Sequence, residues 1–394
     1  MRQLLSVILS ALFFPFHPLL AAGRVTTAGF DRVTDAHYSE VSAHLCDPEA
    51  APEARALMAW LAAQYGAYTL SGQYIDPYQD YTQPQFLDAG GSPDVRLANE
   101  LAVLREVNGG KLPAVLGLDF TGAEFPAQWD GWMTRFAAQW HELGGVVTFC
   151  WHWLVPKDIT VDPADFSRWD SAIYGNDTNF SLKAAMADKN SPGYVWLLQS
   201  IDCIAAQLKI LQAAGVPVLW RPLHEAAGGW FWWGEDRDAY LELYKLLYER
   251  LTQTHGLHNL LWLWNGQDAA WYPGDAYADI LADDPYPPGN YRWLHYVDQA
   301  RAVRFKYTRR ANPAKMVAMS ENATLPAPDR MWEQNTRWLF FCTWNREMML
   351  KPDPQNQPYG LLREFSEKYN SAKAMRKIYG DPRVLTLERC QWRQ

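Results

Sequence analysis

Short apolar runs bounded by turn residues recur along this chain, with helix-like stretches between them. This alternation is typical of βα units and of a parallel sheet. The predicted strands are residues 67–72, 113–120, 146–153, 217–225, 259–266, 279–286, 315–322 and 338–345. Eight such strands are the number that closes a (β/α)8 barrel.

The connecting segments support this α/β architecture. Apolar residues at helical spacing predict helices at residues 52–65, 132–143, 195–215 and 238–256. An open, doubly wound sheet is the main alternative, but no GxGxxG motif follows the first strand. We therefore expect a single (β/α)8 barrel domain with elaborated loops. The segment 156–192 is rich in Asp, Asn and Ser and is expected to cover part of a cleft.

The predicted strands share one pattern, an apolar start and a polar or aromatic end. Seven of the eight runs begin apolar and end in polar or aromatic residues, and the first leads into SGQY. In a barrel of this kind, the strand bodies fill the core and the C-terminal strand ends line the active site. The chain also has 20 Trp and 20 Tyr, more than a core needs. Such rings stack on sugars as readily as they pack.

Charge narrows the range of ligands. The formal net charge is −8 at pH 7, and no segment concentrates Lys and Arg. A nucleic-acid-binding surface needs such a basic footprint, so nucleic acid is not an expected partner. An uncharged substrate fits better.

The N-terminal segment MRQLLSVILSALFFPFHPLLAAGR resembles a secretory signal. Arg2 gives a positive start, and the apolar run 4–14 is too short to span a bilayer. We predict a signal peptide at residues 1–22, a mature catalytic domain at 23–394, and a secreted or periplasmic location. An uncleaved membrane anchor is the alternative. No further run of 18 apolar residues appears, so the mature chain is expected to have no membrane attachment. We also expect a monomer that binds a polysaccharide or oligosaccharide.

The five cysteines are scattered without CxxC spacing, which argues against a zinc or redox motif. In an oxidising compartment, Cys46 and Cys390 are the candidate disulfide. Cys150 and Cys342 lie in strand-like runs and are expected to be buried thiols.

Potential metal ligands follow no recognisable spacing, so neither a metal nor a cofactor is expected. The residues weighed for this role are Asp283, Asp284, His295 and Asp298.

Two predicted strands end in a glutamate, Glu225 after RPLH and Glu321 after MVAMS. Hydrolysis of a glycosidic bond needs two carboxyl groups that flank it. Either glutamate alone would be read as a solvated loop residue, but the pair at apolar strand ends beside Trp, Tyr and His favours catalysis. A serine hydrolase is disfavoured because no GxSxG motif occurs.

The segment WRPLHEAAGGWFWWG resembles the signature of glycoside hydrolase family 26, best known for endo-β-1,4-mannanases. Further similar segments are SGQ, LGLDF, WHWLVP, LWLWNGQ with the following WYPGD, ADDPYPPG and the SE of the seventh strand. The resemblance runs from about Ser71 to Trp344. It implies a retaining enzyme that cleaves mannan, with Glu225 as acid/base and Glu321 as nucleophile.

The resemblance also implies other site residues. A tyrosine at the place of Tyr286 and a histidine at the place of His224 belong to the family's active site, although a plain structural role for His224 remains open. His152, in the WHW segment, is implied to bind a sugar hydroxyl.

The residues themselves suggest further roles. Arg221 lies four residues before Glu225, so strand alternation would place both on one side, with Arg221 near Glu321. Tyr286 is placed to donate its hydroxyl to Glu321, and Asp119 either binds sugar hydroxyls or holds Arg221.

Aromatic residues complete the predicted site. Trp230 and Trp344 are candidate sugar platforms, whereas Trp232 and Trp233 are open to a core role. The tryptophans from 230 to 233 are also expected to form an apolar wall that raises the pKa of Glu225.

The chain departs from the family pattern after the last strand. Mannanases of the family often have Arg directly after the strand-eight Trp, whereas here Asn345 follows Trp344 and Arg346 comes next. A β-1,3-xylanase and a mixed-linkage β-glucanase therefore stay open as alternatives. A non-catalytic polysaccharide-binding protein is a third, but it would need neither glutamate.

Overall fold

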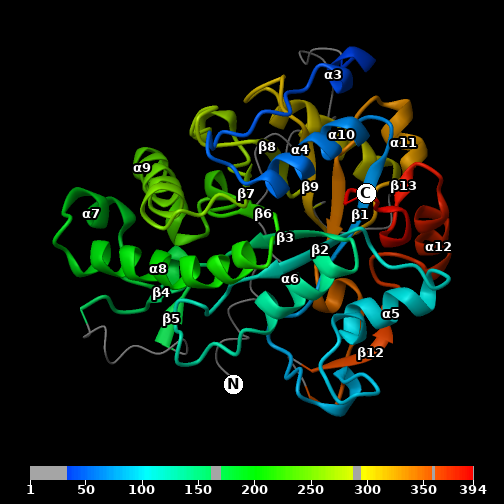
Figure 1. Cartoon of the computed structure of the whole chain (residues 1–394), viewed down its shortest axis with the longest axis horizontal. Coiled ribbons are helices and arrows are strands. Elements are labelled where there is room, and N and C mark those ends of the chain that lie inside the picture. Colours follow the sequence, from blue (N-terminus) through cyan, green and yellow to red (C-terminus); the bar gives the residue numbers. More distant parts are fainter. Residues whose placement is uncertain (1–32, 161–169, 287–293, 357–359, 394) are drawn as a thin grey trace.

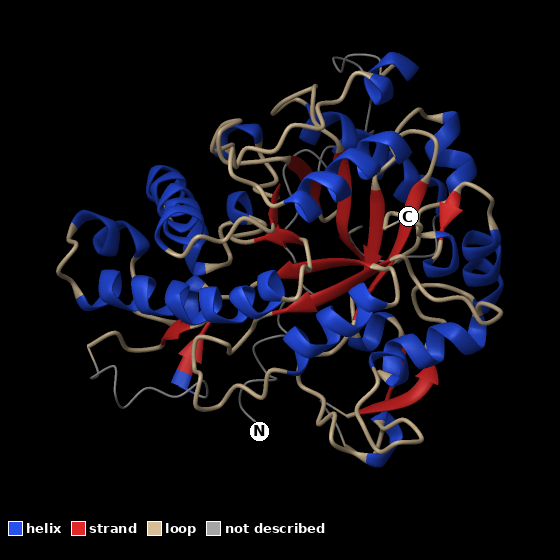
Figure 2. Ribbon diagram, viewed as in Figure 1, coloured by secondary structure: helices blue, strands red, loops and turns tan. Residues whose placement is uncertain are grey.

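A computed structural model describes residues 33–160, 170–286, 294–356 and 360–393. Its centre is a closed barrel of eight parallel strands (Figure 2). The strands are β1 (Thr69–Tyr74), β2 (Val115–Asp119), β3 (Val146–Cys150), β6 (Val218–Arg221), β7 (Leu260–Trp264), β8 (Ile280–Asp283), β9 (Val317–Asn322) and β10 (Phe340–Thr343). The barrel closes where β10 pairs with β1, with Leu70 opposite Phe340. All eight predicted strands are confirmed, and closure excludes the open sheet.

The strands read as continuous apolar runs because both of their faces are covered. Every residue of β7, LLWLW, is buried, and so is every residue of β3. A parallel sheet enclosed by helices on one face and by its own interior on the other shows this pattern. Trp220, Trp262 and Trp264 are among the largest fully buried side chains.

Helices surround the barrel (Figure 1). The principal ones are α4 (Pro52–Gln64), α5 (Asn99–Val107), α6 (Trp132–Glu142), α8 (Pro192–Ala213), α9 (Arg237–Glu249), α10 (Leu294–Arg309), α11 (Pro328–Glu333) and α12 (Ala372–Gly380). The four predicted helices correspond to α4, α6, α8 and α9. α9 begins where the Asp236 side chain accepts from the N–H groups of Asp238 and Ala239, and a π-helical turn, Arg250–Thr254, continues it.

Shorter helices and strands lie outside the barrel and its principal helices. They are α3 (Asp35–Ser39), α7 (Leu182–Ala187), the antiparallel pair β4 (Val155–Pro156) and β5 (Ser171–Ala172), the pair β11 (Leu350–Pro352) and β12 (Leu361–Phe365), and β13 (Val384–Leu385). β13 extends the sheet beside the start of β1. The segment 156–192, expected as one long loop, therefore contains β5 and α7.

Helix α8 has the length and apolar content to cross a membrane. Half of its most apolar window is buried in the protein, where α8 packs against α6 and α7 (Figure 1). Leu197, Ile201 and Leu208 are among its buried side chains. The helical layer thus accounts for the buried half of this apolar window. The predicted signal peptide lies outside the described residues.

The expected Cys46–Cys390 disulfide is wrong, because all five cysteines are free. The Cys46 N–H binds Asp279 near the start of β8, whereas the Cys390 carbonyl lies beside Gly144 before β3. The two residues thus sit by different strands of the barrel. Cys150 and Cys342 are buried thiols, as predicted.

Candidate active site

A cavity opens at the C-terminal ends of the barrel strands, where parallel barrels place their active sites. Seven of the nine predicted site residues line it. They are Asp119, His152, His224, Glu225, Tyr286, Glu321 and Trp344. Of the other two, Arg221 is fully buried, and Trp230 contacts Glu225 without being among the lining residues.

Glu225 occupies a left-handed turn, not a strand. β6 ends at Arg221, and Leu223 and Glu225 have φ values of 51° and 56°. The predicted strand ran to residue 225, so the alternation argument that linked Arg221 to Glu225 is wrong. The Glu225 N–H donates to the Asn265 carbonyl at 2.7 Å, which fixes the turn to the end of β7. Non-glycine residues with such φ values cost roughly 1–3 kcal/mol and cluster at functional sites.

The surroundings of Glu225 favour its protonated form. Its side chain is buried, and the Trp230 indole N–H donates to Oε2 at 3.1 Å. Burial raises the pKa of Glu225 well above its usual range, and the negative charges of Asp284 and Glu321 raise it further. The expected raised pKa agrees with this. Trp232 and Trp233, however, are core residues whose indole N–H groups bind the Trp153 and His224 carbonyls.

Glu321 lies within β9, and both of its carboxylate oxygens accept hydrogen bonds. Arg221 Nη2 forms an ion pair with Oε1, and the Tyr286 hydroxyl donates to Oε2 at 2.8 Å. Donors to both oxygens stabilise the ionised form of a carboxyl group. The predicted contacts of Arg221 and Tyr286 with Glu321 are confirmed.

Asp284 is a second partner of Arg221 that the sequence reasoning considered only as a metal ligand. Its Oδ2 lies 2.9 Å from Arg221 Nη1. Asn265 donates to the same oxygen at 2.6 Å, and the Ser320 hydroxyl donates to Oδ1 at 2.6 Å. Burial, together with the charge of Glu321, raises the pKa of Asp284 to about 7 although Arg221 opposes the shift. Its position two residues before Tyr286, at a strand end, was the available signal.

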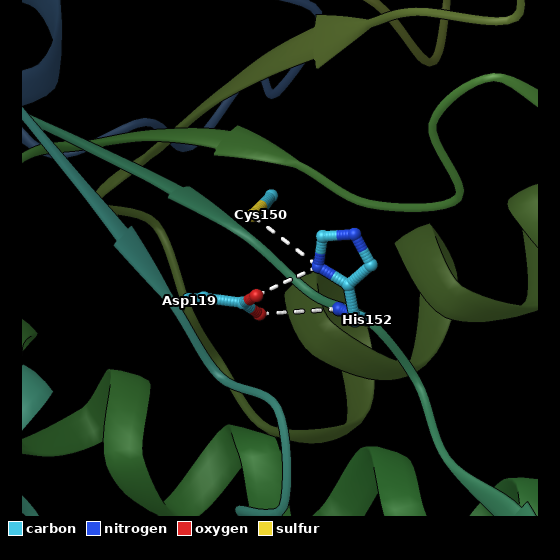
Figure 3. Close-up of side chains that lie close together, drawn as sticks. All are labelled: Asp119, Cys150 and His152. Carbon is cyan, nitrogen blue, oxygen red and sulfur yellow. Dashed lines mark hydrogen bonds and ion pairs between the residues drawn. The ribbon is translucent and has the colours of Figure 1, made fainter. Parts of the chain in front are cut away.

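Asp119 holds His152, and the expectation that it might hold Arg221 is wrong (Figure 3). Asp119 Oδ2 lies 2.7 Å from His152 Nδ1, and Oδ1 accepts from the His152 N–H at 3.2 Å. Burial opposes protonation of His152, but the Asp119 carboxylate raises its pKa. His152 Nε2 lies 3.3 Å from His224 Nε2. Burial and the charges of Arg221 and His152 lower the pKa of His224 well below its usual value.

Asp119, Cys150 and His152 place three potential metal ligands within 4.8 Å of one another (Figure 3). The chemistry of the set does not favour a metal. His152 Nδ1 is engaged by Asp119, and the Cys150 thiol donates to the Leu118 carbonyl at 3.6 Å. Burial raises the pKa of that thiol well above its usual range, and only a thiolate binds metal well.

The acidic residues weighed as metal ligands instead pair with arginines, and the side chain of His295 lies outside the described residues. The pairs are Asp283 with Arg304, Asp284 with Arg221, and Asp298 with Arg301.

Aromatic rings form the walls of the cavity. Trp344 lies 4.7 Å from the ring of Tyr74 and 5.5 Å from that of His152, measured between centroids. Phe231 and Tyr174 stack on each other at 5.7 Å and also line the cavity. The sequence reasoning missed these two residues, although Phe231 directly follows Trp230. Its neighbour Trp230, predicted as a platform, donates its indole N–H to Glu225 and is partly exposed, so its role as a platform stays a prediction.

A barrel whose strand ends bring two glutamates of contrasting environment into one aromatic cavity has the architecture of a glycoside hydrolase. The model of glycosyl hydrolase family 26 matches residues 46–374. The chain belongs to this family.

Similar proteins include a mannan endo-1,4-beta-mannosidase of Thermothelomyces thermophilus, 33% identical over 89% of this chain and 64% of the relative. Mannan endo-1,4-beta-mannosidase B of Piromyces sp is 33% identical over 79% of this chain and 50% of the relative. The chain thus spans about one half to two thirds of the length of these relatives. The crystal structure of the Podospora anserina GH26-CBM35 beta-(1,4)-mannanase has a TM-score of 0.71 at 31% identity, over 90% of this chain and 71% of that one.

Proposed function

We propose that this protein is a retaining mannan endo-1,4-β-mannosidase that cleaves internal β-1,4 bonds of mannan-type polysaccharides. Family membership and the names of its relatives support this substrate. The observation that carries the chemistry is the contrast within one cavity: Glu225 is held towards its protonated form, whereas Glu321 accepts hydrogen bonds on both oxygens.

In the first step, the Glu321 carboxylate attacks the anomeric carbon while Glu225 gives its proton to the departing glycosidic oxygen. The bond between that carbon and oxygen breaks, and a covalent glycosyl-enzyme ester forms. In the second step, Glu225 takes a proton from water, and the resulting nucleophile displaces Glu321 from the sugar. Two inversions at the anomeric carbon retain its configuration.

Neighbouring side chains support these steps. Arg221 and Tyr286 orient Glu321 and stabilise its charge before attack. Asp284 adds negative charge that favours the proton on Glu225 and holds Arg221 in place. His152 and His224 line the cavity as hydroxyl ligands, and Trp344 offers a ring face for sugar stacking.

The test is hydrolysis of linear mannan, β-1,3-xylan and mixed-linkage glucan side by side, with ¹H NMR of the first product. We expect internal cleavage of mannan and initial release of the β-anomer. Initial release of the α-anomer would contradict the double-displacement mechanism. If the protein hydrolysed xylan or glucan but not mannan, the proposed substrate would be wrong, whereas the proposed double-displacement mechanism would stand.

We also propose that residues 1–22 are removed on export and that residues 23–394 form the catalytic domain. The positive start and short apolar run of the N-terminal segment support this. N-terminal sequencing of the protein recovered outside the cytoplasm tests it; a chain that keeps Met1 and sediments with membranes would contradict it.

A further inference from the structure

The arginine that follows β10 lines the cavity, but its charge is used within the protein. Arg346 has a φ of 57°, in the left-handed region. Its guanidinium group is almost fully buried and forms an ion pair with Asp76 at 2.5 Å. Its backbone N–H donates to Glu100 Oε1 at 3.1 Å. The guanidinium group of Arg346 therefore holds Asp76, and its backbone N–H holds Glu100.

These contacts join the loop after β10 to the loop after β1. The Asn345 side chain donates to the Ile75 carbonyl at 3.1 Å, and the Tyr78 N–H donates to Asp76 Oδ1 at 2.9 Å. The Gln73 side chain reaches the Trp344 carbonyl at 3.3 Å. Tyr78 and Trp344 both line the cavity. The two loops, joined by these hydrogen bonds, therefore form one wall of the cavity. We call this the β1–β10 wall.

Glu347 follows Arg346 on this wall and lines the cavity. Its side chain is partly exposed, and within the described part of the chain no donor lies within hydrogen-bond distance of its carboxylate. Other carboxyl groups of the cavity are engaged, Glu225 by Trp230 and Asp119 by His152. Glu347 thus presents a carboxylate acceptor to the space that a substrate would occupy, with the charge of Arg346 beside it.

The carboxylate of Glu347 affects substrate binding strongly once a polysaccharide displaces water from the wall. A carboxylate that loses its water without gaining donors is costly, whereas one that accepts from sugar hydroxyls forms charge-assisted bonds of about twice the ordinary strength. Two neighbouring hydroxyls of one pyranose can serve the two oxygens. A substrate carboxylate at the same place would be repelled.

We propose that Glu347 is a substrate-binding residue that accepts hydroxyl groups of a sugar bound along the β1–β10 wall and selects against acidic sugars there. This inference rests on the proposed function only in that the cavity binds a β-linked polysaccharide. The ion pair of Arg346 with Asp76 fixes the turn that places Glu347 at the cavity.

The test compares Glu347→Ala, Glu347→Gln and the control Glu242→Ala, an exposed glutamate of α9 without a role in the cavity. Steady-state kinetics use whichever β-linked polysaccharide the wild type hydrolyses, so failure on mannan alone leaves this test intact. Glu347→Ala is expected to raise KM roughly 10-fold, as loss of a hydrogen bond to a charged group predicts. kcat should stay within about twofold, since the reacting bond is untouched. The KM of Glu347→Gln should lie between those of the wild type and Glu347→Ala. The KM of Glu242→Ala should match that of the wild type.

A second readout separates binding from structural damage. A hexose polysaccharide oxidised to uronic acid at C6, or a xylan that carries uronic acid substituents, should be cleaved poorly by the wild type. The ratio of kcat/KM for neutral over acidic substrate should fall at least about fivefold in Glu347→Ala, because repulsion is removed. An unchanged KM in Glu347→Ala, or an unchanged ratio, would overturn the inference. A fall in kcat at constant KM would also overturn it.

Discussion

The two glutamates of the cavity come from backbones of opposite kind. Glu321 stands in the regular strand β9, and its carboxylate meets Arg221 and the Tyr286 hydroxyl. Glu225 stands beyond the end of β6 in a left-handed turn, and its only described side-chain donor is Trp230. The same side chain is thus surrounded by hydrogen-bond donors in one segment and by burial and negative charge in the other.

This difference shows that the environment assigns the roles. Donors and positive charge favour a carboxylate that can attack, whereas burial and nearby negative charge favour an acid that can donate. Arg221 and Asp284 link the two sites, since Arg221 pairs with both Asp284 and Glu321. A change on one side should therefore alter the other in a predictable direction.

The largest expected effect comes from removing either glutamate. Glu321→Ala should lower kcat on polysaccharide by roughly 10⁵-fold, a loss of the size seen when a nucleophile is deleted. Glu225→Ala should cost about 10²–10⁴-fold, the contribution of general acid catalysis.

An aryl glycoside with a good leaving group sharpens this comparison. The leaving group of this substrate needs little protonation, so Glu225→Ala should still form the glycosyl-enzyme, which is seen as a burst of phenolate. Glu321→Ala lacks the nucleophile, so it should show no burst. Equal losses in both variants on this substrate would contradict the assignment of roles.

The next effect concerns the donor to Glu321. Tyr286→Phe removes the hydroxyl that binds Oε2. We expect kcat/KM to fall roughly 10- to 100-fold, because hydrogen bonds to charged groups contribute about 1.5–3 kcal/mol. The matched control is Tyr244→Phe, since Tyr244 is a buried tyrosine whose hydroxyl has no partner among the described residues. A comparable loss in the control would point to general destabilisation.

Asp284→Asn should shift the pH profile. Asp284 raises the pKa of Glu225 by its negative charge, so its neutralisation lowers that pKa. Activity requires protonated Glu225 and is lost as pH rises through its pKa. The basic limb of kcat/KM should therefore move to lower pH by roughly one unit. A basic limb that stays in place would mean that Asp284 does not act on the acid.

Trp230→Phe should give the smallest shift, and in the opposite direction. The indole N–H favours the ionised form of Glu225, and phenylalanine cannot replace it. The basic limb should move to higher pH by a few tenths of a unit, about the size expected for one neutral donor. A shift to lower pH would show that Trp230 acts through packing instead.

The strand pattern could be predicted well from the sequence, with one instructive error. Continuous burial makes the strands apolar throughout, so β7 and β3 are visible as runs. The end of β6 was placed four residues too late, because nothing local marks Leu223 and Glu225 as left-handed. In that conformation the Glu225 N–H donates to the carbonyl of Asn265, just after β7, a contact between segments 40 residues apart in the sequence that no local pattern reveals.

The site was predicted less completely. Residues at strand ends, such as His152 and Tyr286, were found because barrel topology brings those ends together. Asp284 and Phe231 were missed as site residues, and His152 was not foreseen as the partner of Asp119. Asp119 and His152 lie at the ends of the neighbouring strands β2 and β3, whereas Arg221 and Asp284 lie at the ends of β6 and β8, with β7 between them. No spacing in the sequence encodes such pairs.

The sequence by itself determined the number of strands and the parallel barrel that they form. It also determined the family of the chain and the two glutamates that the family resemblance singles out. Only the tertiary structure decided which glutamate is surrounded by donors and which by negative charge. The reason is physical: apolar periodicity is a local property of the chain, whereas desolvation and Coulomb interactions depend on groups such as Arg221 and Glu321, which are 100 positions apart in the sequence.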